Sequence, residues 1–280
     1  NDLRMGTVDK QLECQTCGCK FEHCPGHFGH IELARPVYHV GFVETCLKIL
    51  RCVCYNCSAL LLKPGDKNNK YNTIKKIKNP KKRQDMLYNA SKTIKYCGTR
   101  TKDKDDNSTY LSQSDSYSLC VNGCGYEQPI YKKFNNDPLK ISIEFKETNN
   151  ADGNVDKGDK SRILSLSPQQ CLDIFQKITD EDCYMLGFDP TKARPAWMII
   201  KNLAVCPPQV RPSVSVDASL RCEDDLTFQY CQILKINHEI KQQEKSGAPE
   251  HATADSFARL QFYVATLMNN EISSGIAQQR

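Results

Sequence analysis

The segment Cys14–His27 reads C-Q-T-C-G-C-K-F-E-H-C-P-G-H and offers a complete set of metal ligands in one short loop. Cys14, Cys17, Cys24 and His27 follow the spacing C-x2-C-x6-C-x2-H. A structural zinc ion takes four nitrogen or sulfur ligands in a tetrahedron, whereas a catalytic zinc ion keeps one position open. Three thiolates and an imidazole fill all four positions, so the spacing predicts a closed structural zinc site.

Disulfide bonds are the alternative use of the 16 cysteines in this chain of 280 residues. Disulfide scaffolds are typically short secreted domains made behind a signal peptide. The sequence shows no apolar segment of that kind at its start and no apolar run of membrane-spanning length. Ligand spacing, rather than cysteine number, therefore favours zinc.

A second zinc site is predicted further along the chain, where Cys54 and Cys57 form another C-x2-C pair. Two more ligands are needed to close it. Cys97 is one candidate, and Cys120 and Cys124 in C-V-N-G-C-G-Y are equal candidates for the other when spacing alone is considered.

Local patterns predict a mixture of strands and helices. Residues 139–145 alternate apolar and polar side chains, which is typical of a half-buried strand. Ser167, followed by Pro168 and Gln170, predicts a helix that begins with a capping box, and Thr179 gives a similar signal for a second short helix.

Beyond Asp224 the spacing changes to that of two longer helices separated by Ser246–Pro249. Two helices with facing apolar seams predict an antiparallel hairpin, either as a protruding coiled coil or as an amphipathic pair packed on a domain. The seam positions step by three and four residues: Leu226, Tyr230, Ile233, Asn237 and Ile240, then Phe257, Leu260, Val264 and Leu267.

The net charge of +5 is unevenly distributed, because basic residues crowd the segment between the second C-x2-C pair and Cys97. Such a run can attract phosphates or serve as a nuclear address, but a solvated loop is the favoured interpretation. The run consists of Lys75, Lys76, Lys78, Lys81, Lys82 and Arg83.

Two functions can be considered from the residues alone. A free-standing zinc-dependent nucleic-acid-binding protein fits the two C-x2-C pairs, although neither pair is followed by a basic recognition helix at finger spacing. A zinc hydrolase needs an open metal position and a general base, and the motif H-E-x-x-H is missing.

Several longer segments of the chain carry a family resemblance. They are C-P-G-H-F-G-H-I-E-L-A-R-P-V-Y-H-V-G-F from Cys24, R-C-V-C-Y-N-C-S-A-L-L-L from Arg51, A-R-P-A-W-M-I-I from Ala193, V-R-P-S-V from Val210, and the segments D-D-L-T-F and L-Q-F-Y-V-A-T near the end. Through these segments most of the chain resembles the N-terminal clamp region of the largest subunit of DNA-directed RNA polymerase, and the eukaryotic RNA polymerase II version most closely.

The resemblance implies a fold and two complete zinc sites. The expected α+β fold has a zinc-stabilised irregular clamp head with small β elements and helices, and a C-terminal antiparallel helical hairpin, the clamp coiled coil. The expected domains are 1–62, 63–160, 161–222 and 223–280. The family pattern assigns one Zn²⁺ to Cys14, Cys17, Cys24 and His27 and the other to Cys54, Cys57, Cys97 and Cys124, with Cys120 as the second choice for the last ligand.

The resemblance also implies a function within a larger enzyme. The clamp is expected to hold DNA and the RNA-DNA hybrid in the cleft, to contact other polymerase subunits, and to dock initiation and elongation factors on its coiled coil, in the nucleus and without a membrane partner. Nucleotidyl transfer belongs to the full complex and uses Mg²⁺ held by clustered carboxylates. The family's acidic motif N-A-D-F-D-G-D is absent from this sequence, so no catalytic residue is expected here.

Overall fold

The computed structural model describes residues 2–64, 70–100, 120–121, 123–134, 137–145, 162–215 and 221–272. They form two compact units, the first from Asn1–Val40 with Ile199–Arg280 and the second from Gly41–Met198. The mixture of helices and small sheets confirms the predicted α+β class, while the four domain boundaries stay a prediction. Within the described ranges, no helix is both long and apolar enough to cross a membrane.

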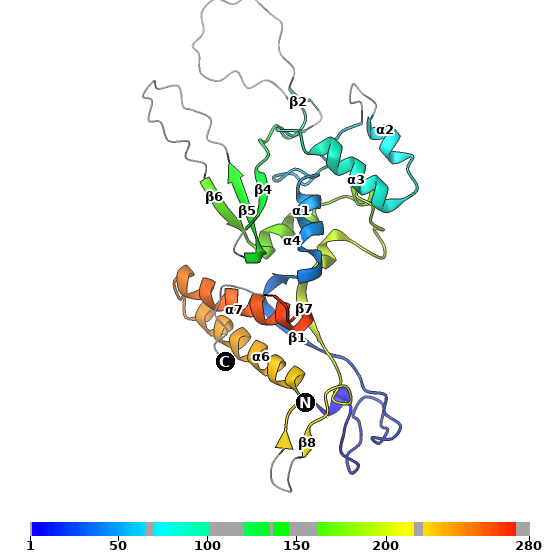
Figure 1. Cartoon of the computed structure of the whole chain (residues 1–280), viewed down its shortest axis with the longest axis vertical. Helices are drawn as coiled ribbons and strands as arrows, with labels where there is room; N and C mark the ends of the chain where they lie inside the picture. Colours follow the sequence, from blue (N-terminus) through cyan, green and yellow to red (C-terminus); the bar gives the residue numbers. More distant parts are fainter. Residues whose placement is uncertain are drawn as a thin grey trace, which may run out of the picture. The chain divides into compact units, whose positions relative to one another are not determined.

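The first unit is a long β-ribbon covered by a helical hairpin (Figure 1). Strand β1 pairs antiparallel with β7, and a second small ribbon joins β8 to β9. The elements of this unit are η1 (Leu3–Met5), β1 (Gly29–Tyr38), β7 (Ile199–Val205), β8 (Val214–Ser215), β9 (Arg221–Cys222), α6 (Asp225–Lys245) and α7 (Glu250–Met268).

Helices α6 and α7 confirm the predicted hairpin, and they pack along the ribbon. The hairpin is antiparallel, since Gln229 near the start of α6 bonds Tyr263 and Thr266 near the end of α7. The seam residues share one core with apolar residues of β1 and β7: Ile31, Leu33, Val37, Leu203, Val205, Tyr230, Ile233, Ile236, Ile240, Leu260 and Val264. The sequence left two forms of the hairpin open, a protruding coiled coil and an amphipathic pair packed on a domain. The shared core shows the amphipathic pair.

Two polar side chains of the hairpin complete hydrogen bonds that the ribbon lacks. The register of β1 against β7 shifts between Glu32 and Val37. There the buried Asn237 accepts a hydrogen bond from the Ala34 amide at 2.6 Å and donates one to the Glu32 carbonyl at 2.9 Å. Gln261 bonds the amide and carbonyl of Tyr38 in the same way, at 2.8 and 2.9 Å. Buried backbone groups need such partners, which explains polar residues in the seam.

The second unit is built from short elements, with a three-stranded antiparallel sheet in the order β4-β5-β6. The elements are α1 (Val43–Leu50), α2 (Lys70–Lys75), α3 (Pro80–Ser91), β2 (Thr99–Arg100), β3 (Cys120–Val121), β4 (Ile130–Phe134), β5 (Asp137–Phe145), β6 (Arg162–Leu166), α4 (Pro168–Gln176), α5 (Asp180–Met185) and η3 (Pro195–Met198). A short turn η2 (Val40–Phe42) precedes α1.

The predicted strand and both capped helices of this unit are confirmed. Strand β5 buries Leu139, Ile141 and Ile143, and the capping box of Ser167 with Gln170 begins α4. Ser142 departs from the predicted alternation, because it is buried and donates a hydrogen bond to the Lys132 carbonyl.

The basic run is solvated as predicted at its five lysines, but the prediction of a loop is wrong for most of it, because helices α2 and α3 form there. The side chain of Asn79 caps α3 by accepting a hydrogen bond from the amide of Lys82, and Pro80 occupies the first turn. Arg83 is not part of the exposed charge, since only 3% of its surface is exposed.

Candidate metal centres

The first candidate centre lies in the irregular segment between η1 and β1. Cys14, Cys17, Cys24 and His27 point one ligand atom each toward a common point, and these atoms all lie within 4.8 Å of one another. The Cys24 Sγ and His27 Nε2 atoms are 3.8 Å apart. The structure thus brings together all four residues that the spacing predicted.

Backbone hydrogen bonds of a tight turn hold the first pair of thiols. The Cys14 amide donates to the Cys19 carbonyl at 3.0 Å, and the Gly18 amide donates to the Cys14 carbonyl at 2.8 Å. Gly18 has a φ of 68°, a left-handed conformation that glycine adopts readily. The Thr16 amide points at the Cys14 sulfur, at 3.4 Å. The loop therefore holds its thiols through its own backbone.

The second candidate centre joins three segments of the second unit. Cys54, Cys57, Cys97 and Cys124 again place all four sulfur atoms within 4.8 Å of one another. The Sγ atoms of Cys54 and Cys124 are 3.5 Å apart, and those of Cys57 and Cys97 are 3.7 Å apart. The side chain of Cys120 lies outside the described residues, and the described cluster is complete with Cys124.

The turn at Cys54 repeats the hydrogen bonds of the turn at Cys14. The Cys54 amide donates to the Ala59 carbonyl at 2.9 Å, and the Ser58 amide donates to the Cys54 carbonyl at 3.0 Å. Ser58 takes the place of Gly18 and has a φ of 60°, the only positive value among the described non-glycine residues. The hydroxyl of Ser58 is buried without a hydrogen-bond partner. The second turn thus has the same backbone conformation as the first, but a serine, which adopts a positive φ less readily than glycine, stands at its left-handed position.

Both ligand sets fit a tetrahedral zinc ion. Zinc-sulfur bonds of about 2.3 Å in a tetrahedron place neighbouring sulfurs about 3.8 Å apart. The two sulfur–sulfur separations of 3.5 and 3.7 Å in the second centre agree with that edge. All four ligands of each set come from the protein, so both centres suit a structural ion rather than a catalytic one.

In each centre the surroundings lower the pKa of one thiol, Cys17 in the first and Cys124 in the second. The side chain of His27, and after it the backbone of Cys19, lower the pKa of the Cys17 thiol to about 6. Burial raises the pKa of Cys124, but the amide of Tyr126 and the other three thiols outweigh it and bring the pKa to about 7. The thiolate is the form that binds metal.

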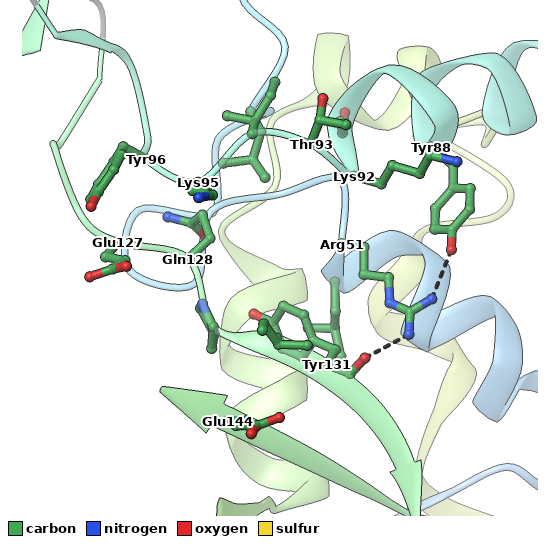
Figure 2. Close-up of a pocket in the computed structure, with 16 residues that line it drawn as sticks. Arg51, Tyr88, Lys92, Thr93, Lys95, Tyr96, Glu127, Gln128, Tyr131 and Glu144 are labelled. Carbon is green, nitrogen blue, oxygen red and sulfur yellow. Dashed lines mark hydrogen bonds between the residues drawn. The ribbon is translucent and has the colours of Figure 1, made fainter. Parts of the chain in front are cut away.

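A cavity of about 670 Å³ adjoins the second centre through Gln128 (Figure 2). Gln128 lines the cavity, and its Nε2 atom donates to the Cys54 sulfur at 3.3 Å. Arg51 crosses the cavity wall and donates to the Tyr88 hydroxyl at 2.8 Å and to the Tyr131 carbonyl at 2.6 Å. The sequence did not predict this cavity, because its lining comes from well-separated stretches of the chain.

A model of the family described as RNA polymerase Rpb1, domain 1, matches residues 1–280. The chain belongs to this Rpb1 family. It is also similar to the DNA-directed RNA polymerase II subunit RPB1 of Euplotoides octocarinatus, with 43% identity over 274 residues that cover 97% of the chain. The chain spans about half of that relative, 52% of its length. The predicted resemblance to the largest polymerase subunit is thereby confirmed.

The Rpb1 family match also covers both ligand clusters, since each lies inside the matched residues. The two cysteine-rich groups of this Rpb1 domain are able to hold two metal ions. Zinc is the ion that four thiolates, or three thiolates and an imidazole, suit best.

Proposed function

We propose that this chain forms the clamp of a DNA-directed RNA polymerase, as a segment of its largest subunit, in the nucleus. The observation that carries this proposal is the Rpb1 family match along the whole chain. The similarity to an RNA polymerase II subunit supports the same assignment. The clamp holds DNA and the RNA-DNA hybrid in the cleft while the complex synthesises RNA on a DNA template.

In this proposal the chain contributes mechanics rather than catalysis. The acidic motif of the family is absent from the sequence, so the Mg²⁺ of nucleotidyl transfer is held elsewhere in the full enzyme. The partners of the chain are the other polymerase subunits, the nucleic acids, and initiation and elongation factors that dock on the α6–α7 hairpin. The exposed turn of that hairpin, Ser246–Pro249, offers the docking surface.

Two zinc ions, one in each ligand cluster, are part of the proposal. The first would be held by Cys14, Cys17, Cys24 and His27, and the second by Cys54, Cys57, Cys97 and Cys124. Bound zinc contributes on the order of 10 kcal/mol to the folding of small metal-dependent domains. Such a contribution suits segments that have few long helices or strands of their own.

Purification of the tagged chain from its own cells tests the proposal. The expected result is co-purification of the other polymerase subunits, RNA synthesis that depends on a DNA template, and two zinc ions per chain by elemental analysis. Recovery of the chain without other subunits, but with zinc and bound nucleic acid, would instead favour a free-standing zinc-dependent nucleic-acid-binding protein.

A further inference from the structure

Five exposed lysines gather where α2 ends and α3 begins. We call Lys75, Lys76, Lys78, Lys81 and Lys82 the lysine platform; each of them is exposed. Figure 1 shows α2 and α3 joined by a short connection, which carries two of these residues, Lys76 and Lys78. Like charges crowded in this way create a local positive potential that attracts polyanions.

No carboxylate forms an ion pair with the lysine platform among the described residues. None of the ion pairs that the structure describes includes one of its five lysines. Asp85 is the only acidic residue of α2 and α3, and it pairs with Lys48 at 3.5 Å. The positive charge of the platform therefore stays available to a partner.

The backbone beneath the lysine platform is fixed by Arg83. This side chain turns inward, donates to the Ile77 carbonyl at 2.7 Å and to the Tyr184 carbonyl at 2.8 Å, and lies 3.9 Å from the centre of the Tyr184 ring. Gly187 packs so closely that an added Cβ would lie 2.6 Å from the Pro80 carbonyl oxygen. A partner would thus meet a preorganised surface, and preorganisation lowers the ordering cost of binding.

The charges at the start of α3 oppose the stability of the helix itself. The N-terminal end of a helix carries a partial positive charge and favours acidic residues. The first turn of α3 has no acidic residue and carries Lys81 and Lys82 instead. A bound anion would reduce this repulsion. Without a bound anion, the two lysines only destabilise the start of α3.

We propose that the lysine platform binds the phosphate backbone of duplex DNA. The inference rests on the proposed function, since a polymerase clamp meets DNA. Residues 75–82 include no aromatic side chain on which unpaired bases could stack, and the Tyr184 ring beneath them already has Arg83 over one face. Both observations favour a duplex over a single strand. Lysine acts on phosphate as a point charge, so the contact does not depend on base sequence.

Binding of the zinc-loaded full chain to a short fluorescent duplex, measured by anisotropy over a range of salt concentrations, tests this proposal. The test variant is the double substitution Lys81→Gln and Lys82→Gln. The matched control is Lys177→Gln with Lys192→Gln, which removes the same charge from exposed positions outside the platform. Each lost phosphate contact lowers the slope of log K against log salt by about one. The test variant should therefore lose about two from the slope, and the control should keep the slope of the unaltered chain.

The outcomes separate this proposal from the proposed function. The test variant should keep its two zinc ions, a melting temperature no lower than that of the unaltered chain, and its association with other polymerase subunits. An unchanged slope in the test variant would overturn the proposal, and so would an equal change in the control. A larger loss for single-stranded RNA or for an acidic polypeptide than for the duplex would assign the platform to that partner and also overturn it. Failure of subunit association in the unaltered chain would count against the proposed function alone.

Discussion

Replacement of Ser58 by glycine should stabilise the second metal centre. Ser58 holds a φ of 60° in the turn that carries Cys54 and Cys57. The equivalent turn in the first centre has glycine, Gly18, at the same place with a φ of 68°. The two turns share their backbone hydrogen bonds, so the same conformation is required of both residues.

The magnitude follows from three effects. Relief of the left-handed conformation is worth about 1 to 2 kcal/mol for a residue with a Cβ. Ser58 is only 1% exposed, and its hydroxyl has no partner, so its removal gains about 1 to 3 kcal/mol. Glycine costs about 0.5 to 1 kcal/mol because the unfolded chain becomes more flexible. The net expectation is a stabilisation of about 1 to 4 kcal/mol.

Urea unfolding of the zinc-loaded chain, together with competition for zinc by a chromogenic chelator, measures this effect. The midpoint should rise, and the second zinc ion should be held roughly fivefold or more tightly, since 1.4 kcal/mol corresponds to a factor of about ten. Ser165→Gly is the matched control: this exposed strand residue has an ordinary φ, and the substitution should destabilise by about 0.5 to 1 kcal/mol. A Ser58→Gly chain that is no more stable than the unaltered one would refute the reasoning.

Three further predictions concern the ligands and the hairpin. Cys124→Ser should leave one zinc ion per chain by elemental analysis, whereas Cys120→Ser should leave two; the reverse result would reassign the ligand. Leu260→Asp should lower the melting temperature sharply, because Leu260 is fully buried and a buried unpaired carboxylate costs several kcal/mol. Reversal of charge at Lys245, beside the exposed turn Ser246–Pro249, should weaken factor binding in a pull-down while the melting curve and both zinc ions stay unchanged, and undiminished binding would remove this residue from the docking surface.

Local patterns predicted those parts of the structure that depend on nearby residues. The ligands of the first centre lie within one short loop, so their spacing was sufficient to bring them together. The hairpin could also be predicted from local sequence, since the apolar residues of its seam repeat every three to four residues. The presence of Asn237 in that seam had no explanation from sequence, because its partners, the Ala34 amide and the Glu32 carbonyl, belong to a distant strand.

Features that depend on distant segments were not predicted. The ribbon pairs β1 with β7, and β1 does not alternate regularly because its register shifts between Glu32 and Val37. The charge of the basic run favoured a loop. The buried contacts of Arg83 with Ile77 and Tyr184 instead stabilise two helices there. Spacing also left Cys120 and Cys124 equivalent, because a fourth ligand at such sequence distance is chosen by the fold rather than by the turn.

The two metal centres differ in how much chain they organise. In the first centre the longest gap between ligands runs from Cys17 to Cys24, seven residues, whereas in the second centre Cys57 and Cys97 are 40 residues apart. The entropy lost on closing a loop grows as (3/2)RT ln n, so the longer gap costs about 1.5 kcal/mol more to close. Loss of metal from the first centre would release one loop that its own backbone hydrogen bonds still shape. Loss of metal from the second centre would release three separate segments at once. We therefore expect the fold to depend more on a metal ion at the second centre than on one at the first.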